Sequence, residues 1–302
     1  MKRVVVTGGA GFIGSNLVDE LISNQYEVII LDNLSTGKSA NINPQAKFIY
    51  CHLQEISENE LINLFTGVDI IFHTAALARV QPSIEHPKMF NKANVDSTLN
   101  VLLAAHKAGV KRVVYSASSS CYGSTSQFPT PEDSPTNPLS PYGLQKYIGE
   151  QYCRVFSQVY GLDTVSLRYF NVYGERQSLE GAYKLVLGIF AKQRLENKPL
   201  TITNDGNQRR DFTYVKDVVQ ANILAAQYKN NLNGESFNIG NGDNCSINEV
   251  AEMIGGSVEY IGTRLEPFET LADNTKAKKI LGWVPQGNLR DWIKQYKIQL
   301  GI

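Results

Sequence analysis

Tyr142 and Lys146 are the residues whose types and spacing most directly suggest chemistry in this chain. They lie four residues apart on a predicted helix, so a phenol and an ammonium group share one helical face. A nearby cation stabilises a phenolate, and such a tyrosine can exchange a proton near neutral pH. A surface pair is the alternative, because Tyr-x-x-x-Lys also arises by chance. The pair opens the helix that follows the predicted strand Arg112–Ser116, which favours the chemical interpretation.

A serine-rich segment, Ser116–Gly123, follows the same predicted strand. Its hydroxyl groups, among them that of Ser118, could hydrogen-bond to a sugar hydroxyl or to a carbonyl group. The alternative is a turn whose serines bond to their own backbone, and the segment by itself favours that alternative.

A glycine-rich turn predicts a dinucleotide site at the start of the chain. Gly8-x-x-Gly11-x-x-Gly14 lies between an apolar run and an amphipathic helix whose N-terminus would face a phosphate. The next strand ends at Asp32, about 20 residues further on, which is the expected spacing. A carboxylate there accepts hydrogen bonds from ribose hydroxyls and repels a 2′-phosphate, so Asp32 favours NAD over NADP. A turn aspartate is the alternative, and Lys38 keeps NADP as a minor possibility.

The elements that must position these residues alternate between strand-like and helical patterns. Strands are predicted at 47–50, 69–73, 112–116 and 164–168, and helices at 58–65, 94–108 and 142–160. This alternation predicts an α/β fold with a Rossmann-like doubly wound parallel sheet. Ligands bind such sheets at the carboxyl ends of the strands, where each of these motifs falls.

The second half of the chain has a looser pattern. A long proline- and serine-rich loop, 124–141, is expected to be a functional cover. Helices are predicted near 183–195, 215–227 and 273–281, and strands near 200–203 and 237–239. We expect an NAD-binding domain over residues 1–170, with returning segments near 212–240, and a smaller α/β substrate-binding lobe over residues 171–302.

Composition excludes several classes of protein. Lysine plus arginine equals aspartate plus glutamate at 29 each in 302 residues, which does not favour a nucleic-acid-binding protein. The four cysteines are scattered, so neither a disulfide framework nor a metal site is expected. No stretch reaches transmembrane length, and we expect a soluble, cytoplasmic protein.

Together, these motifs resemble the extended short-chain dehydrogenase/reductase family, and more narrowly its nucleotide-sugar 4-epimerases. The resemblance extends from Met1 to about Trp283. The segments that carry it are Thr7–Gly14, Asp32–Leu34, His73–Ala76, Ser118–Gly123, Tyr142–Lys146, Arg168–Gly174 and Arg210–Phe212.

The resemblance implies a role for individual residues. Tyr142 would be the base, Lys146 would bind the nicotinamide ribose, and Ser118 would lie at the reacting hydroxyl. NAD would contact Gly8, Gly11, Phe12, Ile13, Asp32, Asn33, Leu34, Ser35, Thr36, Gly37, His52, Leu53, Thr74, Ala75, Ala76, Asn94, Tyr142, Lys146 and Phe170. Asn171 and Arg210 would hold the UDP phosphates, and the substrate would also contact Ser118, Lys184, Leu185, Thr201, Ile202, Thr203, Arg264 and Thr270.

The implied reaction inverts C4 of a UDP-hexose through a transient 4-keto sugar. Tyr142 takes the C4 hydroxyl proton, directly or through Ser118, while hydride passes to NAD and later returns. Related dehydratases carry an Asp-Glu pair where Ser119 and Ser120 stand, and related decarboxylases carry a glutamate at the second position. The absence of both carboxylates favours an epimerase.

Three positions bear on specificity or depart from the family pattern. In the resembling epimerases the residue at position 270 closes the pocket near C2, and the small Thr270 favours UDP-GlcNAc/UDP-GalNAc together with UDP-glucose/UDP-galactose. An ordinary strand threonine is the alternative. His52 stands where an aspartate usually accepts the adenine amino group, and it could equally be a surface histidine. Arg264 is the best match for a late phosphate-binding arginine, although its segment is one residue short.

Two other functions remain open. UDP-glucuronate 4-epimerases have a similar serine-rich segment but favour threonine where Asn171 stands, and they need a cation for the sugar carboxylate, which Arg79 or Arg176 could supply. A non-catalytic NAD-sensing or scaffold protein would have no need for the Ser118, Tyr142 and Lys146 set. The family also suggests a homodimer through the helices at 94–108 and 142–160.

Overall fold

A parallel sheet forms the centre of the molecule. The computed structural model describes residues 2–178, 185–263 and 266–302, and every neighbouring pair in this seven-stranded sheet is parallel. Chain order reverses between β1 and β4, where ligands bind in such sheets. The doubly wound sheet predicted from the sequence is therefore confirmed. In spatial order the strands are β11 (Glu235–Ile239), β6 (Asp163–Tyr169), β5 (Arg112–Ser118), β4 (Ile70–His73), β1 (Arg3–Thr7), β2 (Glu27–Asp32) and β3 (Lys47–Tyr50).

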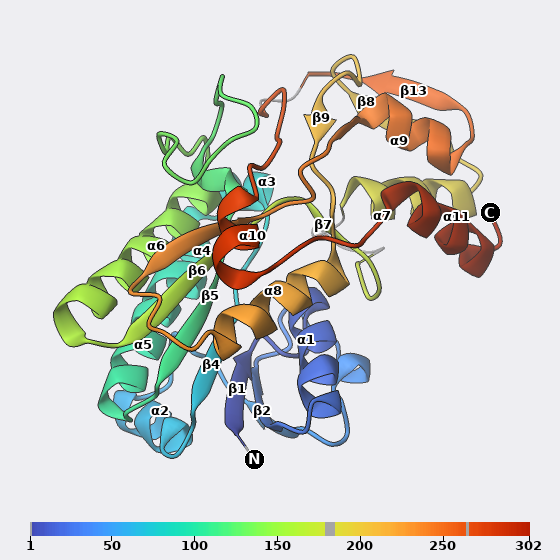
Figure 1. Ribbon diagram of the computed structural model, residues 1–302. Coiled ribbons are helices and arrows are strands. Elements are labelled where there is room, and N and C mark those ends of the chain that lie inside the picture. The colour runs from blue at the N-terminus through green and yellow to red at the C-terminus, as the bar shows by residue number, and fades with distance from the viewer. Residues whose placement is uncertain (1, 179–184, 264–265) are drawn as a thin grey trace.

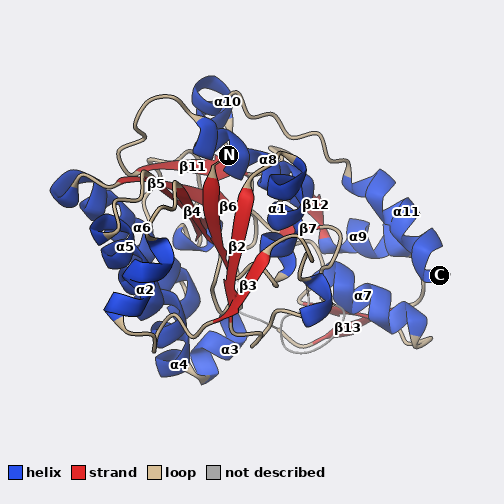
Figure 2. Cartoon of the chain, turned by 90° about the horizontal axis from the view of Figure 1, so that it is seen from below, coloured by secondary structure: helices blue, strands red, loops and turns tan. Residues whose placement is uncertain are grey.

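Helices cover both faces of this sheet, as Figure 2 shows. On one face α1 (Phe12–Ser23) packs beside α8 (Val215–Gln227), and on the other α5 (Ser97–Lys107) lies between α2 (Glu58–Phe65) and α6 (Pro141–Tyr160). Successive residues of β1 alternate between the two cores: Val4 and Val6 join the first, and Val5 joins the second. Burial on both faces explains why the strands read as continuous apolar runs.

A smaller part of the chain packs to one side of the sheet (Figure 1). Its helices α7 (Val186–Leu195), α9 (Ile247–Ile254) and α11 (Leu289–Leu300) surround a third hydrophobic core. Three two-stranded sheets complete it: β8 (Leu200–Thr203) with β13 (Val258–Ile261), β9 (Arg209–Arg210) with β12 (Cys245–Ser246), and β7 (Val172–Tyr173) with β10 (Thr213–Tyr214). The chain returns to the large sheet through α8, β11 and α10 (Thr275–Leu281). The division at residue 170 stays a prediction.

Four predicted elements coincide with the observed ones at both ends. The helices over 58–65 and 215–227 and the strands over 47–50 and 200–203 have the predicted bounds. The helix predicted over 94–108 differs, because its α-helical part begins only at Ser97, after a π-helical turn over 92–96. Asn94 in that turn is buried and bonds through its side chain to both backbone groups of Leu77. This tertiary contact accounts for the irregular turn.

Helices α9 and α11 were not predicted. Helix α9 begins with a capping box in which the Ser246 side chain accepts a bond from the Glu249 N–H while Glu249 bonds back to the Ser246 N–H. A serine followed three residues later by a glutamate is a known signature of a helix N-terminus, and this pattern could have predicted the start of α9. None of the helices in the described ranges is long and apolar enough to cross a membrane.

A buried ion pair at the amino end of β5 anchors the segment that returns to the sheet. Arg112 Nε lies 2.5 Å from Asp163 Oδ2, and its other nitrogens donate to main-chain carbonyls of Ala225, Tyr228 and Asn230. Asp163 Oδ1 accepts the N–H groups of residues 232 and 233. Both side chains are buried, so neither charge has water as an alternative partner.

Substituting Arg112 by methionine tests this anchor. The change keeps the side-chain stem but leaves Asp163 buried without its cation, so we expect the free energy of unfolding to fall by about 3–5 kcal/mol. Denaturant unfolding of the wild type and Arg112→Met measures the difference. A loss below about 1 kcal/mol would be typical of an exposed pair and would contradict this interpretation.

Candidate functional site at the carboxyl edge of the sheet

The glycine-rich turn packs tightly against the neighbouring strand end. Gly8 has φ +70°, and a Cβ on it would lie 2.7 Å from Ala75 Cα. A Cβ on Gly14 would lie 2.2 Å from the Gly8 carbonyl oxygen. The N-cap residue of α1 is Gly11, which has no side chain to cap the helix, and the first turn contains no acidic residue. The turn therefore leaves a helix N-terminus open to an anion, in a space that only glycine allows.

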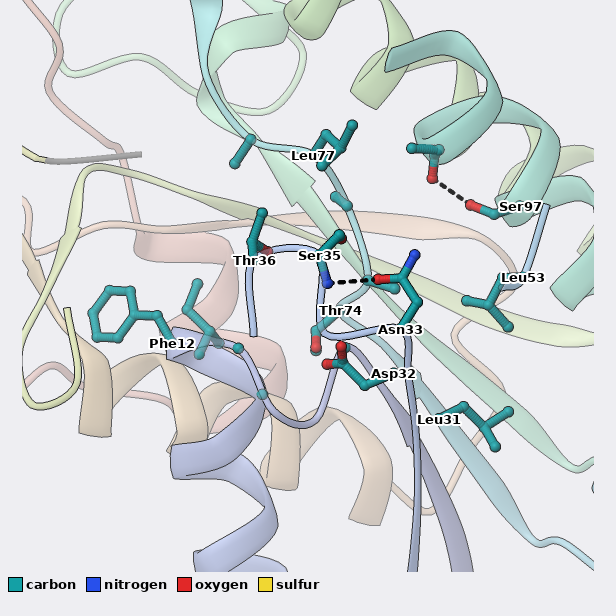
Figure 3. Close-up of a pocket in the computed structure, with 18 of the residues that line it drawn as sticks. Phe12, Leu31, Asp32, Asn33, Ser35, Thr36, Leu53, Thr74, Leu77 and Ser97 are labelled. Atoms are coloured by element: carbon teal, nitrogen blue, oxygen red, sulfur yellow. Dashed lines mark hydrogen bonds between the residues drawn. The ribbon is translucent and has the colours of Figure 1, made fainter. Parts of the chain in front are cut away.

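A cavity of about 250 Å³ lies in front of this turn. Figure 3 shows side chains from the start of α1, the end of β2 and the segments after β3 and β4 around it. The structure thus brings together most of the predicted cofactor residues from four separate stretches of sequence. Those that line the cavity are Gly8, Gly11, Phe12, Ile13, Asp32, Asn33, Ser35, Thr36, Leu53, Thr74, Ala75 and Ala76.

Asp32 is held in place by two backbone groups. Its Oδ2 accepts the Ala10 N–H at 2.9 Å, and its Oδ1 accepts the Leu34 N–H at 2.7 Å. Leu34 itself does not line the cavity and has φ +56°. The Asp32 carboxylate faces the cavity beside Asn33 (Figure 3), and its remaining lone pairs can accept bonds from ligand hydroxyls.

His52 lies beside the cavity and not in its lining. Both ring nitrogens have protein partners: Nδ1 is 3.3 Å from Asn33 Nδ2, and Nε2 is 3.1 Å from the Tyr50 hydroxyl. The lining at this end comes instead from Cys51, Leu53 and Gln54. The contact between His52 and adenine stays a prediction, and Cys51 and Gln54 were missed because the strand pattern gave no reason to single them out.

Three further predicted cofactor residues are not among those that line the cavity. A Cβ on Gly37 would lie 2.9 Å from the Cβ of Ala10, so a glycine at this position allows the loop after β2 to approach the glycine-rich turn after β1. Asn94 holds Leu77, which lines the cavity, by two hydrogen bonds of 2.8 and 3.0 Å. Phe170 is buried in a small cluster with Tyr122. Gly37 and Asn94 thus support segments that line the cavity, whereas Phe170 belongs to a separate buried cluster.

Ser118 and Tyr142 come together where β5 ends and α6 begins. Ser140 caps α6 by accepting the Gly143 N–H at 3.1 Å, and the Tyr142 N–H donates to Ser83 Oγ at 3.1 Å. Burial raises the pKa of Tyr142, whereas a hydrogen bond with Ser118 and the positive charge of Arg79 lower it. Ser118 also accepts a bond from the Ser120 hydroxyl at 2.8 Å. The phenol is therefore linked to a chain of hydroxyl groups.

Lys146 is 3% exposed and points toward an aromatic ring. Its Nζ lies 4.3 Å from the centre of the Tyr115 ring, and burial lowers its pKa to about 7. The positive charge of Arg79 lowers the pKa of Tyr142, a role beyond the predicted one of Arg79 as a ligand for a sugar carboxylate. His73 stays neutral, because burial first and Lys146 second lower its pKa to about 3.

A second cavity, of about 340 Å³, adjoins the first. Arg79 and Leu185 line both. Of the predicted substrate residues, Asn171, Leu185, Thr201, Thr203 and Arg210 line the second cavity, whereas the Ile202 side chain points into the third core. Lys184 and Arg264 lie outside the described residues. The same cavity also contains Gln208 and Glu266, which no sequence signal had indicated.

Arg210 already has a carboxylate partner in this cavity. Its Nη2 lies 2.6 Å from Glu266 Oε2, and the main-chain oxygen of Arg209 accepts a bond from Nη1 at 2.8 Å. Glu266 Oε1 lies 3.3 Å from the Thr203 hydroxyl. A phosphate bound to Arg210 would have to share or displace this carboxylate.

Lys146→Met tests the cost of burying the ammonium group. A pKa near 7 in the folded state, against about 10.4 in an unfolded chain, means that the unfolded chain binds more protons between these pH values and that stability rises with pH. We expect Lys146→Met to be about 1–4 kcal/mol more stable than the wild type near pH 6, with the gain fading toward about pH 10. Denaturant unfolding of cofactor-free protein measures this difference. A pH-independent difference would contradict the assignment.

The comparisons with known proteins agree with this geometry. Residues 4–240 match the NAD dependent epimerase/dehydratase family. Three similar solved structures each cover 99% of this chain and are themselves covered to 99%. They are a Thermotoga maritima UDP-glucose 4-epimerase with UDP-glucose (38% identity, TM-score 0.92), a Methanobrevibacter ruminantium UDP-N-acetylglucosamine 4-epimerase with UDP-N-acetylmuramic acid (36%, 0.91) and a Bacillus cereus UDP-glucuronic acid 4-epimerase with UDP-glucuronic acid and NAD (33%, 0.90). The chain therefore belongs to the NAD-dependent epimerase/dehydratase family, and its cofactor is NAD.

Proposed function

We propose that this chain is a UDP-sugar 4-epimerase that interconverts UDP-GlcNAc with UDP-GalNAc and also accepts UDP-glucose and UDP-galactose. One observation carries the proposal: the first cavity and a second cavity adjoin through Arg79 and Leu185 at the carboxyl edge of the large sheet. A sugar between the two cavities would lie next to the cofactor while its nucleotide occupies the second cavity. The similarity to epimerases of three different UDP-sugars supports the reaction but leaves the sugar open.

The residues of the first cavity suit NAD. The glycine turn leaves room for a pyrophosphate at the N-terminus of α1, and Asp32 offers a carboxylate to the adenosine ribose hydroxyls. NAD, when bound, would supply the reversible hydride chemistry that inversion at the sugar C4 requires.

The proton chemistry belongs to Tyr142 and Ser118. Tyr142 takes the proton of the C4 hydroxyl, directly or through the Ser118 hydroxyl, and returns it when the opposite epimer forms. Burial raises the pKa of the Tyr142 phenol, and the hydrogen bond with Ser118 and the charge of Arg79 oppose this rise in part.

The absence of carboxylates beside Ser118 supports epimerisation over elimination. Ser119 and Ser120 occupy the turn directly after β5, where an additional acid and base would have to stand to remove water from the sugar. With hydroxyl groups only, this turn can orient a hydroxyl or a ketone but cannot drive a second proton transfer.

A second candidate function is 4-epimerisation of UDP-glucuronate. It is favoured by Arg79, a cation that lines both cavities and acts on Tyr142, and thus lies where a sugar carboxylate could reach it. Asn171, where such epimerases favour threonine, argues for the neutral sugars.

The homodimer suggested by the family remains part of the proposal. Helices α5 and α6 pack side by side, and α6 exposes Leu144, Val155 and Val159. These exposed apolar side chains would be covered in a dimer formed through the two helices.

Tyr142→Phe tests the proposed base. The substitution removes only the phenolic oxygen, so we expect bound NAD to be retained while turnover falls by about 10²–10⁴-fold. Cofactor content and the rate of C4 epimer formation measure the two effects separately. Turnover near the wild-type rate in Tyr142→Phe would exclude Tyr142 as the base.

A panel of substrates tests the sugar. Purified protein is incubated separately with UDP-GlcNAc, UDP-glucose and UDP-glucuronate, and the C4 epimers are resolved. We expect turnover of the first two. If Arg79 instead binds a uronate, Arg79→Ser lowers kcat/KM for UDP-glucuronate relative to UDP-GlcNAc by about tenfold or more. Failure to epimerise any of the three while NAD is bound would contradict the proposed function.

A further inference from the structure

Arg168 connects two elements that carry the proposed catalytic residues. It lies in β6 and is 5% exposed. Its Nε and Nη2 donate to the two carboxylate oxygens of Glu150 in α6 at 2.8 and 2.6 Å, and its Nη1 donates to the Tyr122 hydroxyl at 2.6 Å. Glu150 follows Tyr142 and Lys146 on α6. One guanidinium group therefore bonds both to the catalytic helix and to the segment that follows β5.

Tyr122 belongs to the same short turn as Ser118. We call residues 118–122 the serine turn, which forms a single 3₁₀ turn directly after β5. The Ser118 side chain caps this turn by accepting the Ser120 N–H at 3.2 Å, and the Tyr122 N–H donates to the Ser119 oxygen at 3.1 Å. Because these bonds close the turn, a shift of Tyr122 would also move Ser118.

Helix α6 packs closely against the serine turn. A Cβ on Gly143 would lie 2.7 Å from the Ser120 carbonyl oxygen. Tyr142, directly before Gly143, makes its hydrogen bond with Ser118 at this contact. The geometry of that bond therefore depends on how α6 and the serine turn are held relative to each other.

A buried asparagine and a loop hold the serine turn from behind. The Tyr122 hydroxyl donates to Oδ1 of Asn238 in β11 at 2.7 Å, and Asn238 is fully buried. In the long loop 124–141, the main-chain oxygen of Glu132 accepts Arg168 Nη1 at 2.8 Å, and the Glu132 carboxylate accepts the Asn238 N–H at 2.8 Å. Neither Tyr122 nor Arg168 lines the first or the second cavity. Both therefore act on the reaction through the side chains that they hold.

We propose that Arg168 is a positioning residue that sets the distance between Tyr142 and Ser118. It does so by bonding at once to Glu150 on α6 and to Tyr122 on the serine turn. The proposal rests on the proposed function, which assigns the proton transfer to Tyr142 and Ser118. Because Arg168 lies outside both cavities, its loss should lower the rate of turnover and leave the affinity for UDP and NAD unchanged.

Arg112 provides a matched control, a buried arginine without this connection. Its side chain and that of its partner Asp163 are 9% and 6% exposed, against 6% and 4% for Arg168 and Glu150. Its other bonds go to main-chain oxygens in the segment 225–230, and in the described part of the chain none goes to α6 or to the serine turn. A buried pair that only stabilises the fold would behave alike at either position.

Turnover separates the two roles. Epimerisation of UDP-glucose is followed in the wild type, Tyr122→Phe, Arg168→Lys and Arg112→Lys, and bound NAD and the Kd for UDP are measured on the same samples. A lysine cannot bond to both carboxylate oxygens and also reach Tyr122. We therefore expect kcat to fall by about 5–50-fold in Tyr122→Phe and Arg168→Lys, because small displacements of reacting groups are costly.

The other quantities give the contrast. We expect NAD content to stay the same, KM and the Kd for UDP to change by less than about twofold, and Arg112→Lys to keep the wild-type kcat. An unchanged kcat in Tyr122→Phe, or an equal fall in Arg112→Lys, would overturn the proposal.

A double-mutant cycle tests whether the effect passes through Ser118. In a Ser118→Ala background, the hydrogen bond that Arg168 is proposed to position is already absent. We therefore expect Tyr122→Phe to lower kcat by less than about twofold in that background, against about 5–50-fold in the wild type. A fall by the same factor in both backgrounds would mean that the two residues act independently and would contradict the positioning role.

Fluorine NMR tests the same contact without turnover. 3-Fluorotyrosine is incorporated into the NAD-loaded wild type, Tyr122→Phe and Arg112→Lys, and the Tyr142 signal is assigned by its loss in Tyr142→Phe. The bond with Ser118 and the charge of Arg79 both lower the pKa of Tyr142, and only the bond is weakened in Tyr122→Phe.

We expect the pKa of Tyr142 to be higher in Tyr122→Phe than in the wild type by about 0.5 or more, and to be unchanged in Arg112→Lys. Equal pKa values in the wild type and Tyr122→Phe would overturn the proposal. The expected difference in a protein that never epimerises would contradict the proposed function alone.

Discussion

The buried carboxylate of Asp211 is the interaction on which the arrangement of the second cavity depends. Burial raises its pKa to about 6, and three main-chain N–H groups from two other segments offset that cost. One segment follows β11 in the large sheet, and the other leads into α10. Because the Asp211 backbone accepts a bond from Asn171 Nδ2 and donates one to Thr270 Oγ1, this one residue holds both side chains.

The parallel sheet imposes the complementary constraint on the first cavity. Strands β1, β2, β4, β5 and β6 all end at the same edge, so the glycine turn, Asp32 and the segment 74–76 meet in the first cavity, and Ser118 and Asn171 lie at the same edge of the sheet. The close contact between Gly14 and the Gly8 carbonyl keeps the turn narrow. Each cavity is built from particular strand ends, so neither could lie at another place along the sheet.

The cofactor-binding part of the site was predictable because its sequence motifs are local. The apolar strand runs, the glycine spacing and Asp32 can each be recognised from a few neighbouring residues. The fold and the family that they indicated are confirmed. The Tyr142 and Lys146 pair was found by the same local reasoning. Its electrostatics were not, because the Arg79 charge and the Tyr115 ring reach it from other elements.

The second cavity depends on contacts between distant segments. Asn171 meets Thr270 across 99 residues of sequence, and Arg210 meets Glu266 across 56. The short strands β7, β9, β10 and β12 have only two residues each, which is too few for an alternation of apolar and polar residues to be recognised in the sequence. Residues such as Glu266 and Gln208 are polar positions in loops or short strands, and only the folded chain shows that they face a ligand cavity.

The central claim is that a hydride leaves C4 and returns to C4 within one bound complex. The most direct measurement uses UDP-glucose deuterated at C4, mixed with unlabelled UDP-GlcNAc and excess free NAD, with the deuterium located by NMR after epimerisation. The account predicts that deuterium stays at C4 of the UDP-glucose and UDP-galactose pool. Loss of deuterium to solvent, or its transfer to C4 of the N-acetylated sugar, would contradict it.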